Sequence, residues 1–172
     1  MSHALLKAFD LDILASPMAV YTILPNLYLG SFDAAQTAYN EYPNAYVINA
    51  TKDLGFFAPP EDTMRIAVDD NGTIESALGM LLALPAACDA IALALNASPP
   101  RPVIVHCFAG QQRSPTVIAA YLMRSCRWSA EEAVRVVRSH KPDAFFWCVN
   151  FKQTLDLWAC KAKSTFSLDQ RT

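Results

Sequence analysis

The stretch VIVHCFAGQQRSPTVIAAYLM (residues 103–123) places one cysteine and one arginine between two apolar runs. The β-branched run before Cys107 is typical of a central strand, and the run after Arg113 is typical of a helix. Strands that alternate with helices along the chain indicate a single α/β domain with a central sheet. Ligands bind to such sheets beyond the carboxyl ends of the strands, so we expect a functional site at this turn.

Strands and helices are predicted on both sides of this stretch from the spacing of apolar residues. The expected strands lie in residues 18–30, as two strands around a turn at Pro25-Asn26, and in residues 44–51, 62–70 and 103–106. The expected helices lie in residues 31–42, 73–96, 115–126, 129–142 and 149–163. Ser31 suits the N-cap of the first helix, and Ser129 with Glu132 predicts a capping box for the fourth.

Composition limits the classes of protein to consider. The 172 residues are 53% apolar and carry a formal net charge of −2. These values fit one domain with a real core and do not favour disorder or a nucleic-acid partner. The five cysteines are scattered and form no C-x-x-C pair, which argues against a zinc site or a disulfide framework. We therefore expect reduced thiols, no metal and no cofactor.

Two apolar segments bear on localisation. The N-terminal one contains Asp10 and Asp12 and has no basic start, so we predict no secretory signal and a cytoplasmic protein. The run in residues 77–95 approaches membrane-spanning length, but it contains Pro85 and Asp89 and has no basic flank. A helix wrapped in protein has the same composition, so we expect no membrane span.

The turn between strand and helix is suited to holding an anion. Its backbone N–H groups can point at one centre, Gly110 permits the tight turn, and the start of the helix adds positive potential. Arg113 adds a planar guanidinium that can hold two phosphate oxygens. The residues expected to form this phosphate-binding loop are Phe108, Ala109, Gly110, Gln111, Gln112 and Arg113.

Cys107 stands at the start of this loop. The same positive field favours the thiolate form of its side chain, which would face the phosphorus of a bound phosphate. The alternative interpretation is a buried core cysteine with an unrelated surface arginine. That alternative does not explain why strand, cysteine, glycine, arginine, hydroxyl and helix follow in this order.

Residues 106–114 read HCFAGQQRS, which resembles the loop HCxxGxxRS of the cysteine-dependent protein tyrosine phosphatases, in particular the small dual-specificity family. The resemblance extends over residues 20–160. It implies a protein tyrosine phosphatase-like fold, with one domain and a mixed, mostly parallel sheet flanked by helices. It also implies a phosphoric monoester hydrolase that dephosphorylates phosphotyrosine and phosphoserine or phosphothreonine proteins through a phosphocysteine intermediate.

The resemblance assigns roles to individual residues. Cys107 is the nucleophile and Arg113 holds the phosphate. Ser114 supplies the hydroxyl that bonds the thiolate and eases its departure, and His106 gives the loop structural support. An aspartate on an upstream loop is the general acid in this family; the strand register selects Asp70, with Asp69 as the alternative.

The resemblance also divides the chain into segments. Residues 18–163 are the expected catalytic domain, and residues 164–172 are an expected frayed tail. Residues 1–17 form an expected N-terminal helical extension with one apolar stripe. Poxviral members resemble this arrangement and exchange such a helix between two subunits, so a homodimer through this segment is a further expectation.

Two alternative functions stay open. A phosphatase of phosphoinositides or other non-protein phosphates usually has a basic rim, whereas the expected rim here is the neutral pair Gln111-Gln112. Lys52, Arg65 and Arg101 could nevertheless supply basic character near the mouth. An inactive phospho-binding module normally lacks the cysteine, the arginine or the acid, and this chain has all three. Phosphorylated proteins are therefore the expected partners, with phosphoinositides as the alternative.

Overall fold

The computed structural model describes the backbone of residues 19–169 and the side chains of residues 19–160. The helical extension expected in residues 1–17 lies outside the described residues.

A five-stranded sheet forms the centre of the molecule, with the strand order β1-β2-β5-β3-β4. The strands are β1 (Tyr21–Leu24), β2 (Leu27–Gly30), β3 (Tyr46–Asn49), β4 (Thr63–Arg65) and β5 (Val103–His106). β1 pairs antiparallel with β2, and each of the other neighbouring pairs is parallel. The expected mixed, mostly parallel sheet is confirmed.

β5 is the middle strand, and all of its residues are buried. Gly30 at the end of β2 and Asn49 at the end of β3 both pair with His106 at the end of β5. The carboxyl ends of these three parallel strands therefore meet where the turn after His106 begins, which is where α/β sheets bind ligands.

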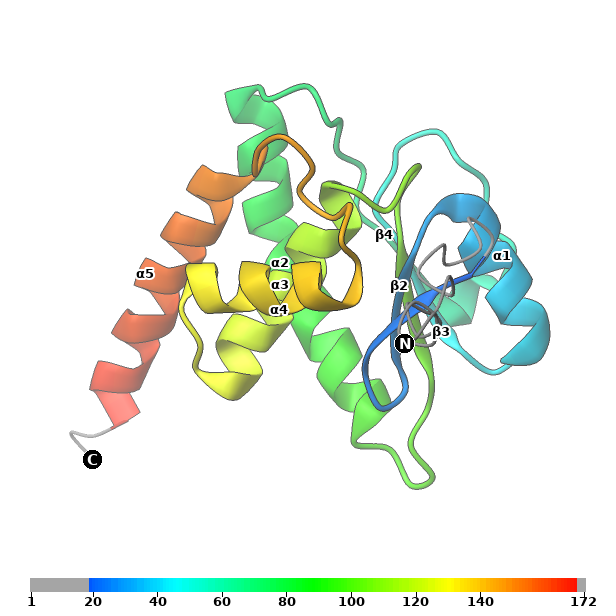
Figure 1. Ribbon diagram of the computed structural model, residues 1–172. Helices are drawn as coiled ribbons and strands as arrows, with labels where there is room; N and C mark the ends of the chain where they lie inside the picture. Colours follow the sequence, from blue (N-terminus) through cyan, green and yellow to red (C-terminus); the bar gives the residue numbers. More distant parts are fainter. Residues whose placement is uncertain (1–18, 170–172) are drawn as a thin grey trace, which may run out of the picture.

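Helices cover both faces of the sheet, with α1 on one face and the other helices on the opposite face (Figure 1). They are α1 (Phe32–Glu41), α2 (Ile74–Leu95), α3 (Arg113–Cys126), α4 (Ala130–His140) and α5 (Lys152–Asp169), with a short 3₁₀-helix at Pro60–Asp62. The predicted caps are confirmed, because Ser31 Oγ accepts from the Ala34 N–H at 3.2 Å and Ser129 forms a capping box with Glu132.

Two elements differ from the expected boundaries. Strand pairing of β4 ends at Arg65, although Ile66 and Val68 are buried in alternation as predicted. The Ile66 N–H still donates to Asn49 O at 2.9 Å. The chain therefore stays beside β3 at Ile66, although regular strand pairing ends at Arg65. At the other end of the chain, α5 continues past Lys163, where a frayed tail was expected, and ends at Asp169.

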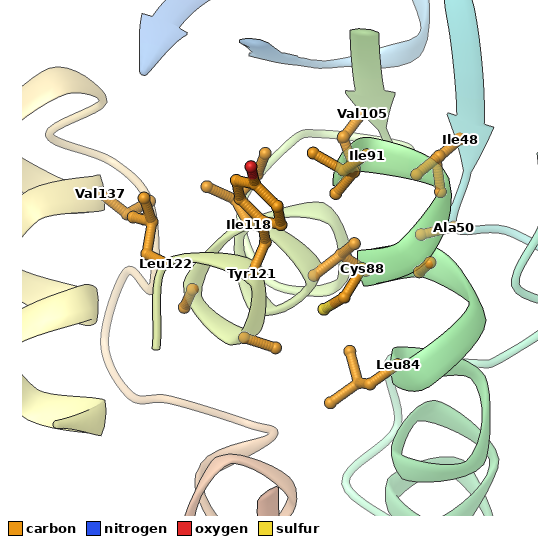
Figure 2. Close-up of a cluster of buried hydrophobic side chains, with 14 of the residues drawn as sticks. Ile48, Ala50, Leu84, Cys88, Ile91, Val105, Ile118, Tyr121, Leu122 and Val137 are labelled. Atoms are coloured by element: carbon orange, nitrogen blue, oxygen red, sulfur yellow. The ribbon is translucent and has the colours of Figure 1, made fainter. Parts of the chain in front are cut away.

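The main core lies between the sheet and the helices α2 to α5. Figure 2 shows Ile48 and Val105 of the sheet facing Ile91 and Cys88 of α2, with Ile118 of α3 beside them. Burial raises the pKa of the Cys88 thiol to about 12, so this cysteine stays neutral and serves as a small apolar residue. Although α2 is long and apolar enough to cross a membrane by length and composition, it contributes one face to this core.

Candidate active site

The turn after β5 brings a thiol and a hydroxyl into contact. Cys107 is only 2% exposed and follows the last residue of β5, while Ser114 lies buried in the first turn of α3. Ser114 Oγ donates to Cys107 Sγ across 3.3 Å. A hydroxyl donor at this distance stabilises a charged sulfur.

Gly110 determines the shape of the loop. Its φ is +71°, and a Cβ on it would lie 2.7 Å from the carbonyl atoms of Gly30. The Phe32 N–H donates to Phe108 O at 3.1 Å, which ties the loop to the turn between β2 and α1. The loop is therefore seated directly on backbone, with no room for a side chain at Gly110.

Arg113 reaches from the loop to the segment that carries the candidate acids. One of its terminal nitrogens, Nη1, donates to Val68 O at 3.4 Å. Within the described part of the chain, the buried side-chain nitrogens and oxygens without a hydrogen-bond partner are Arg113 Nε and His106 Nε2. A buried guanidinium N–H without a partner is costly, and an oxygen of a bound phosphate is the acceptor that it suits.

His106 is buried beneath the loop. Its ring meets Phe32 and Phe57 at centroid distances of 5.6 and 5.4 Å, and its Nδ1 lies 3.3 Å from Cys107 O. Burial lowers the pKa of His106 to about 4, against the smaller raising effect of its hydrogen bond to Cys107, so the ring is neutral at neutral pH. This environment suits the supporting role expected for His106.

The two candidate acids have different partners. Asp69 forms an ion pair with Lys52. Asp70 is exposed, and its Oδ1 accepts from Asn150 Nδ2 at 2.6 Å. The backbone N–H of Asn150 in turn donates to Gln112 Oε1 at 3.1 Å. Asp70 is thus linked through Asn150 to the residue that precedes Arg113.

Comparison with known proteins decides the family. Residues 27–161 match the family described as "Dual specificity phosphatase, catalytic domain". The chain belongs to the dual-specificity phosphatase family. The crystal structure of human DUSP28 is similar to this chain, with a TM-score of 0.70 and 25% identity over 84% of this chain and 95% of that one. The protein tyrosine phosphatase-like fold expected from the sequence is thus confirmed.

Several relatives in the dual-specificity phosphatase family are similar in sequence. The dual specificity protein phosphatase Mpk3 of Drosophila melanogaster is 35% identical over 127 residues, which are 70% of this chain and 29% of that protein. The protein of Invertebrate iridescent virus 6 named "Putative tyrosine phosphatase 123R" is 31% identical over 72% of this chain and 80% of its own length. Human phosphatidylglycerophosphatase and protein-tyrosine phosphatase 1 is 57% identical over 35 residues, 20% of this chain and 17% of that protein. The match thus spans under a third of Mpk3 and of the human protein.

Both glutamines of this phosphatase-family loop have hydrogen-bond partners. Gln112 is buried, and its Nε2 donates to Phe146 O at 3.2 Å and Cys148 O at 2.9 Å. Gln111 is half-buried and donates to Asp143 Oδ2 at 3.2 Å. Both amides therefore hold the segment between α4 and α5. Nothing in the sequence indicated that Asn150 contacts the site, because only the fold brings this segment to the loop.

The three cations that could supply basic character near the mouth all have partners in the structure. Lys52 pairs with Asp69, and the guanidinium of Arg65 donates to the backbone carbonyls of residues 51, 52 and 54. Arg101 pairs with Asp62 just before β5, at the opposite end of that strand from Cys107. These contacts stabilise loops; Lys52 and Arg101 are paired with carboxylates, whereas the carbonyl partners of Arg65 leave its positive charge in place.

The described side chains include no cluster of metal-ligating residues. Over residues 19–160, no three or more His, Cys, Asp or Glu side chains are grouped so that they could hold a metal ion.

Replacing Gly110 with alanine is expected to lower the free energy of unfolding by about 3 kcal/mol, because the new Cβ meets the Gly30 backbone and the left-handed φ is strained. Gly72 is the matched control: its φ is also +71°, but a Cβ there has no neighbour within 4 Å. Gly72→Ala should therefore cost only the conformational part, about 1 kcal/mol. Urea unfolding measures both; equal losses in the two variants would show that the contact with Gly30 does not matter.

Proposed function

We propose that this chain is an active protein phosphatase that removes phosphate from phosphotyrosine and from phosphoserine or phosphothreonine through a phosphocysteine intermediate. The observation that carries the proposal is the contact between Ser114 Oγ and Cys107 Sγ beside the unpartnered Nε of Arg113. These groups supply a nucleophile, a donor that stabilises it and a guanidinium that suits a phosphate oxygen.

In the first step, Cys107 Sγ attacks phosphorus as the thiolate, and the bond from phosphorus to the substrate oxygen breaks. Arg113 and the N–H groups of the loop hold the remaining phosphate oxygens as charge develops on them. The Asp70 carboxyl gives its proton to the leaving oxygen, so that an alcohol or phenol departs. The products of this step are the free hydroxyl compound and phosphocysteine.

In the second step, water attacks phosphorus and the bond from phosphorus to Sγ breaks. The Asp70 carboxylate takes a proton from that water, and Ser114 Oγ donates to the departing thiolate. Phosphate leaves, and Asp70 is protonated again for the next turnover.

Asp70 is a better candidate for the acid than Asp69 because of their partners. Asp69 is held in an ion pair with Lys52, and it would have to leave that pair to reach a substrate. Asp70 has a neutral amide as its partner, and that amide connects it to the phosphate-binding loop. Asp70 can therefore carry a proton to the substrate without first breaking an ion pair.

Substrate class follows from the charges around the mouth. Lys52 and Arg101 are paired with carboxylates, so of these three cations only Arg65 keeps an unneutralised charge to attract the further phosphates of an inositol lipid. Phosphoproteins are the substrates that this favours. The name of the human relative covers both a phospholipid and a protein activity, so a phosphorylated lipid such as a phosphoinositide is the second candidate.

A substrate panel tests the proposed function. Release of phosphate is measured from phosphotyrosine, phosphoserine and phosphothreonine peptides and from phosphoinositides in vesicles, with Cys107→Ser as the background. Turnover of phosphopeptides above that background is expected. Turnover of phosphoinositides alone would transfer the proposal to the lipid class, and no turnover of any substrate would favour a phospho-binding module.

We also propose a cellular location and an oligomeric state for this protein. A cytoplasmic location agrees with the reduced thiol that the mechanism requires. A homodimer through residues 1–17 would bury the apolar stripe of that segment.

A further inference from the structure

An aromatic pair is exposed on the segment between α4 and α5. Phe145 is fully buried and anchors this segment, but Phe146 is 52% exposed and Trp147 is 91% exposed. The rings of Phe146 and Trp147 meet edge to face, with centroids 4.8 Å apart. Two large aromatic side chains side by side in water are unusual unless something binds to them.

The backbone that presents this pair is strained. Trp147 has a φ of +67°, and the Cys148 N–H donates to Phe146 O at 2.9 Å, which closes a three-residue γ-turn around Trp147. Residues with side chains adopt this conformation at a cost, and glycine would adopt it freely. Strain of this kind persists where the surroundings enforce it, and it is concentrated at functional sites.

Gln112 enforces the turn from the phosphate-binding loop. Its amide donates to the carbonyls of Phe146 and Cys148, on either side of Trp147, and accepts from the N–H of Asn150. Asn150 also holds Asp70. Figure 1 shows the segment in orange, beside the turn that follows β5. The backbone of the aromatic pair is therefore tied directly to the phosphate-binding loop, and Asn150, three residues after Trp147, contacts the candidate acid.

The charges around the aromatic pair favour a peptide over a membrane. Asp143 is paired with Lys141, and the guanidinium of Arg138 donates to the carbonyls of Ala144 and Phe145. Asp70 adds an acidic group on the side of the site. Anionic lipid attracts clusters of several cations, and among these neighbours only Arg138 is a cation without a carboxylate partner. Phe108, which is 67% exposed on the phosphate-binding loop itself, adds further apolar surface.

We propose that Phe146 and Trp147 form a docking ledge for a large apolar side chain next to the phosphorylated residue of a protein substrate. This inference rests on the proposed function and names the feature that a substrate must have beside its phosphate. The phosphate-binding loop holds the phosphate, and the ledge removes the neighbouring side chain from water. Because Gln112 holds the backbone of the ledge, binding does not require that backbone to become ordered.

The test uses two phosphotyrosine peptides that differ only in having leucine or glycine at the positions flanking the phosphotyrosine. For the unmodified chain, kcat/KM is expected to be about tenfold higher with leucine, the low end for an apolar contact that stays partly open to water. In Trp147→Ala the ratio should fall to about one. Leu93→Ala is the matched control, because Leu93 is 79% exposed near the end of α2 and away from the mouth, and it should keep the full ratio.

A second variant separates docking from a purely structural role. Trp147→Gly removes the ring and relieves the positive φ, so it should lose the leucine preference while its melting temperature rises. Loss of preference together with a lower melting temperature, or an unmodified chain without any preference, would overturn the ledge. So would a Trp147→Ala variant that loses only the turnover of phosphoinositide vesicles, because the pair would then serve membrane contact.

Binding distinguishes failure of the ledge from failure of the proposed function. The same two peptides, carrying a phosphonate analogue that cannot be hydrolysed, are titrated by calorimetry into the unmodified chain. A preference for leucine in binding supports the ledge even if no phosphopeptide is turned over. Turnover without any preference in binding or in kcat/KM contradicts the ledge and leaves the phosphatase activity intact.

Discussion

A Cys107→Ser variant is expected to lose turnover of phosphopeptides by roughly 10⁴–10⁶-fold, the usual consequence of removing a catalytic nucleophile. The serine hydroxyl is a far weaker nucleophile than a thiolate at neutral pH. Binding of phosphate should persist, because the anion is held by backbone N–H groups and by Arg113, not by sulfur. Rates of phosphate release and calorimetric titration with a phosphopeptide measure the two effects separately.

Cys126→Ser is the matched control for loss of a thiol. Cys126 is half-buried at the end of α3, the opposite end of that helix from the loop. This variant should keep its turnover within about twofold, as surface-like substitutions usually do. Substantial residual turnover in Cys107→Ser would contradict nucleophilic catalysis by Cys107, and a comparable loss in Cys126→Ser would point to unfolding as the cause.

Asp70→Asn is expected to lower turnover of phosphotyrosine peptides by about 10²–10⁴-fold, the usual contribution of general acid catalysis. The substitution keeps the size of the side chain and removes its proton. A substrate with a good leaving group, such as p-nitrophenyl phosphate, should lose less because its leaving oxygen needs little protonation. The limb of the pH profile at higher pH, which reflects loss of the proton from the acid, should flatten.

Asp69→Asn is the control for that experiment. It breaks the ion pair with Lys52 but leaves the bond between Asp70 and Asn150, so only a small loss is expected. A large, leaving-group-dependent loss in Asp69→Asn and not in Asp70→Asn would assign the acid to Asp69. If neither variant shows it, the acid lies outside this pair.

Local signals in the sequence predicted much of the fold. A β-branched run before Cys107 and an apolar helical run after Arg113 describe β5 and α3, and both elements form. Capping signals work in the same way, because Ser129 and Glu132 are close enough in sequence to bond each other wherever the helix forms. These predictions needed only interactions over a few residues.

The contacts around the mouth could not be predicted in this way. Gln112 and Asn150 are far apart in the sequence, and a glutamine in a loop gives no sign of the backbone that it will bond. The sequence likewise gives no sign that the guanidinium of Arg65 bonds the backbone carbonyls of residues 51 and 54. The choice between Asp69 and Asp70 was narrowed by strand register, and their different partners appear only in the folded chain.

The phosphocysteine intermediate is the most direct test of the proposed mechanism. In Ser114→Ala the thiolate leaves more slowly, because the hydroxyl that donates to Cys107 Sγ is gone, and the intermediate should accumulate. This variant is mixed with p-nitrophenyl phosphate, quenched in acid within milliseconds, digested and analysed by mass spectrometry. The account predicts phosphate on the peptide that contains Cys107, together with a burst of p-nitrophenol. Continued turnover with no phosphate on Cys107, or with phosphate on another residue, would contradict it.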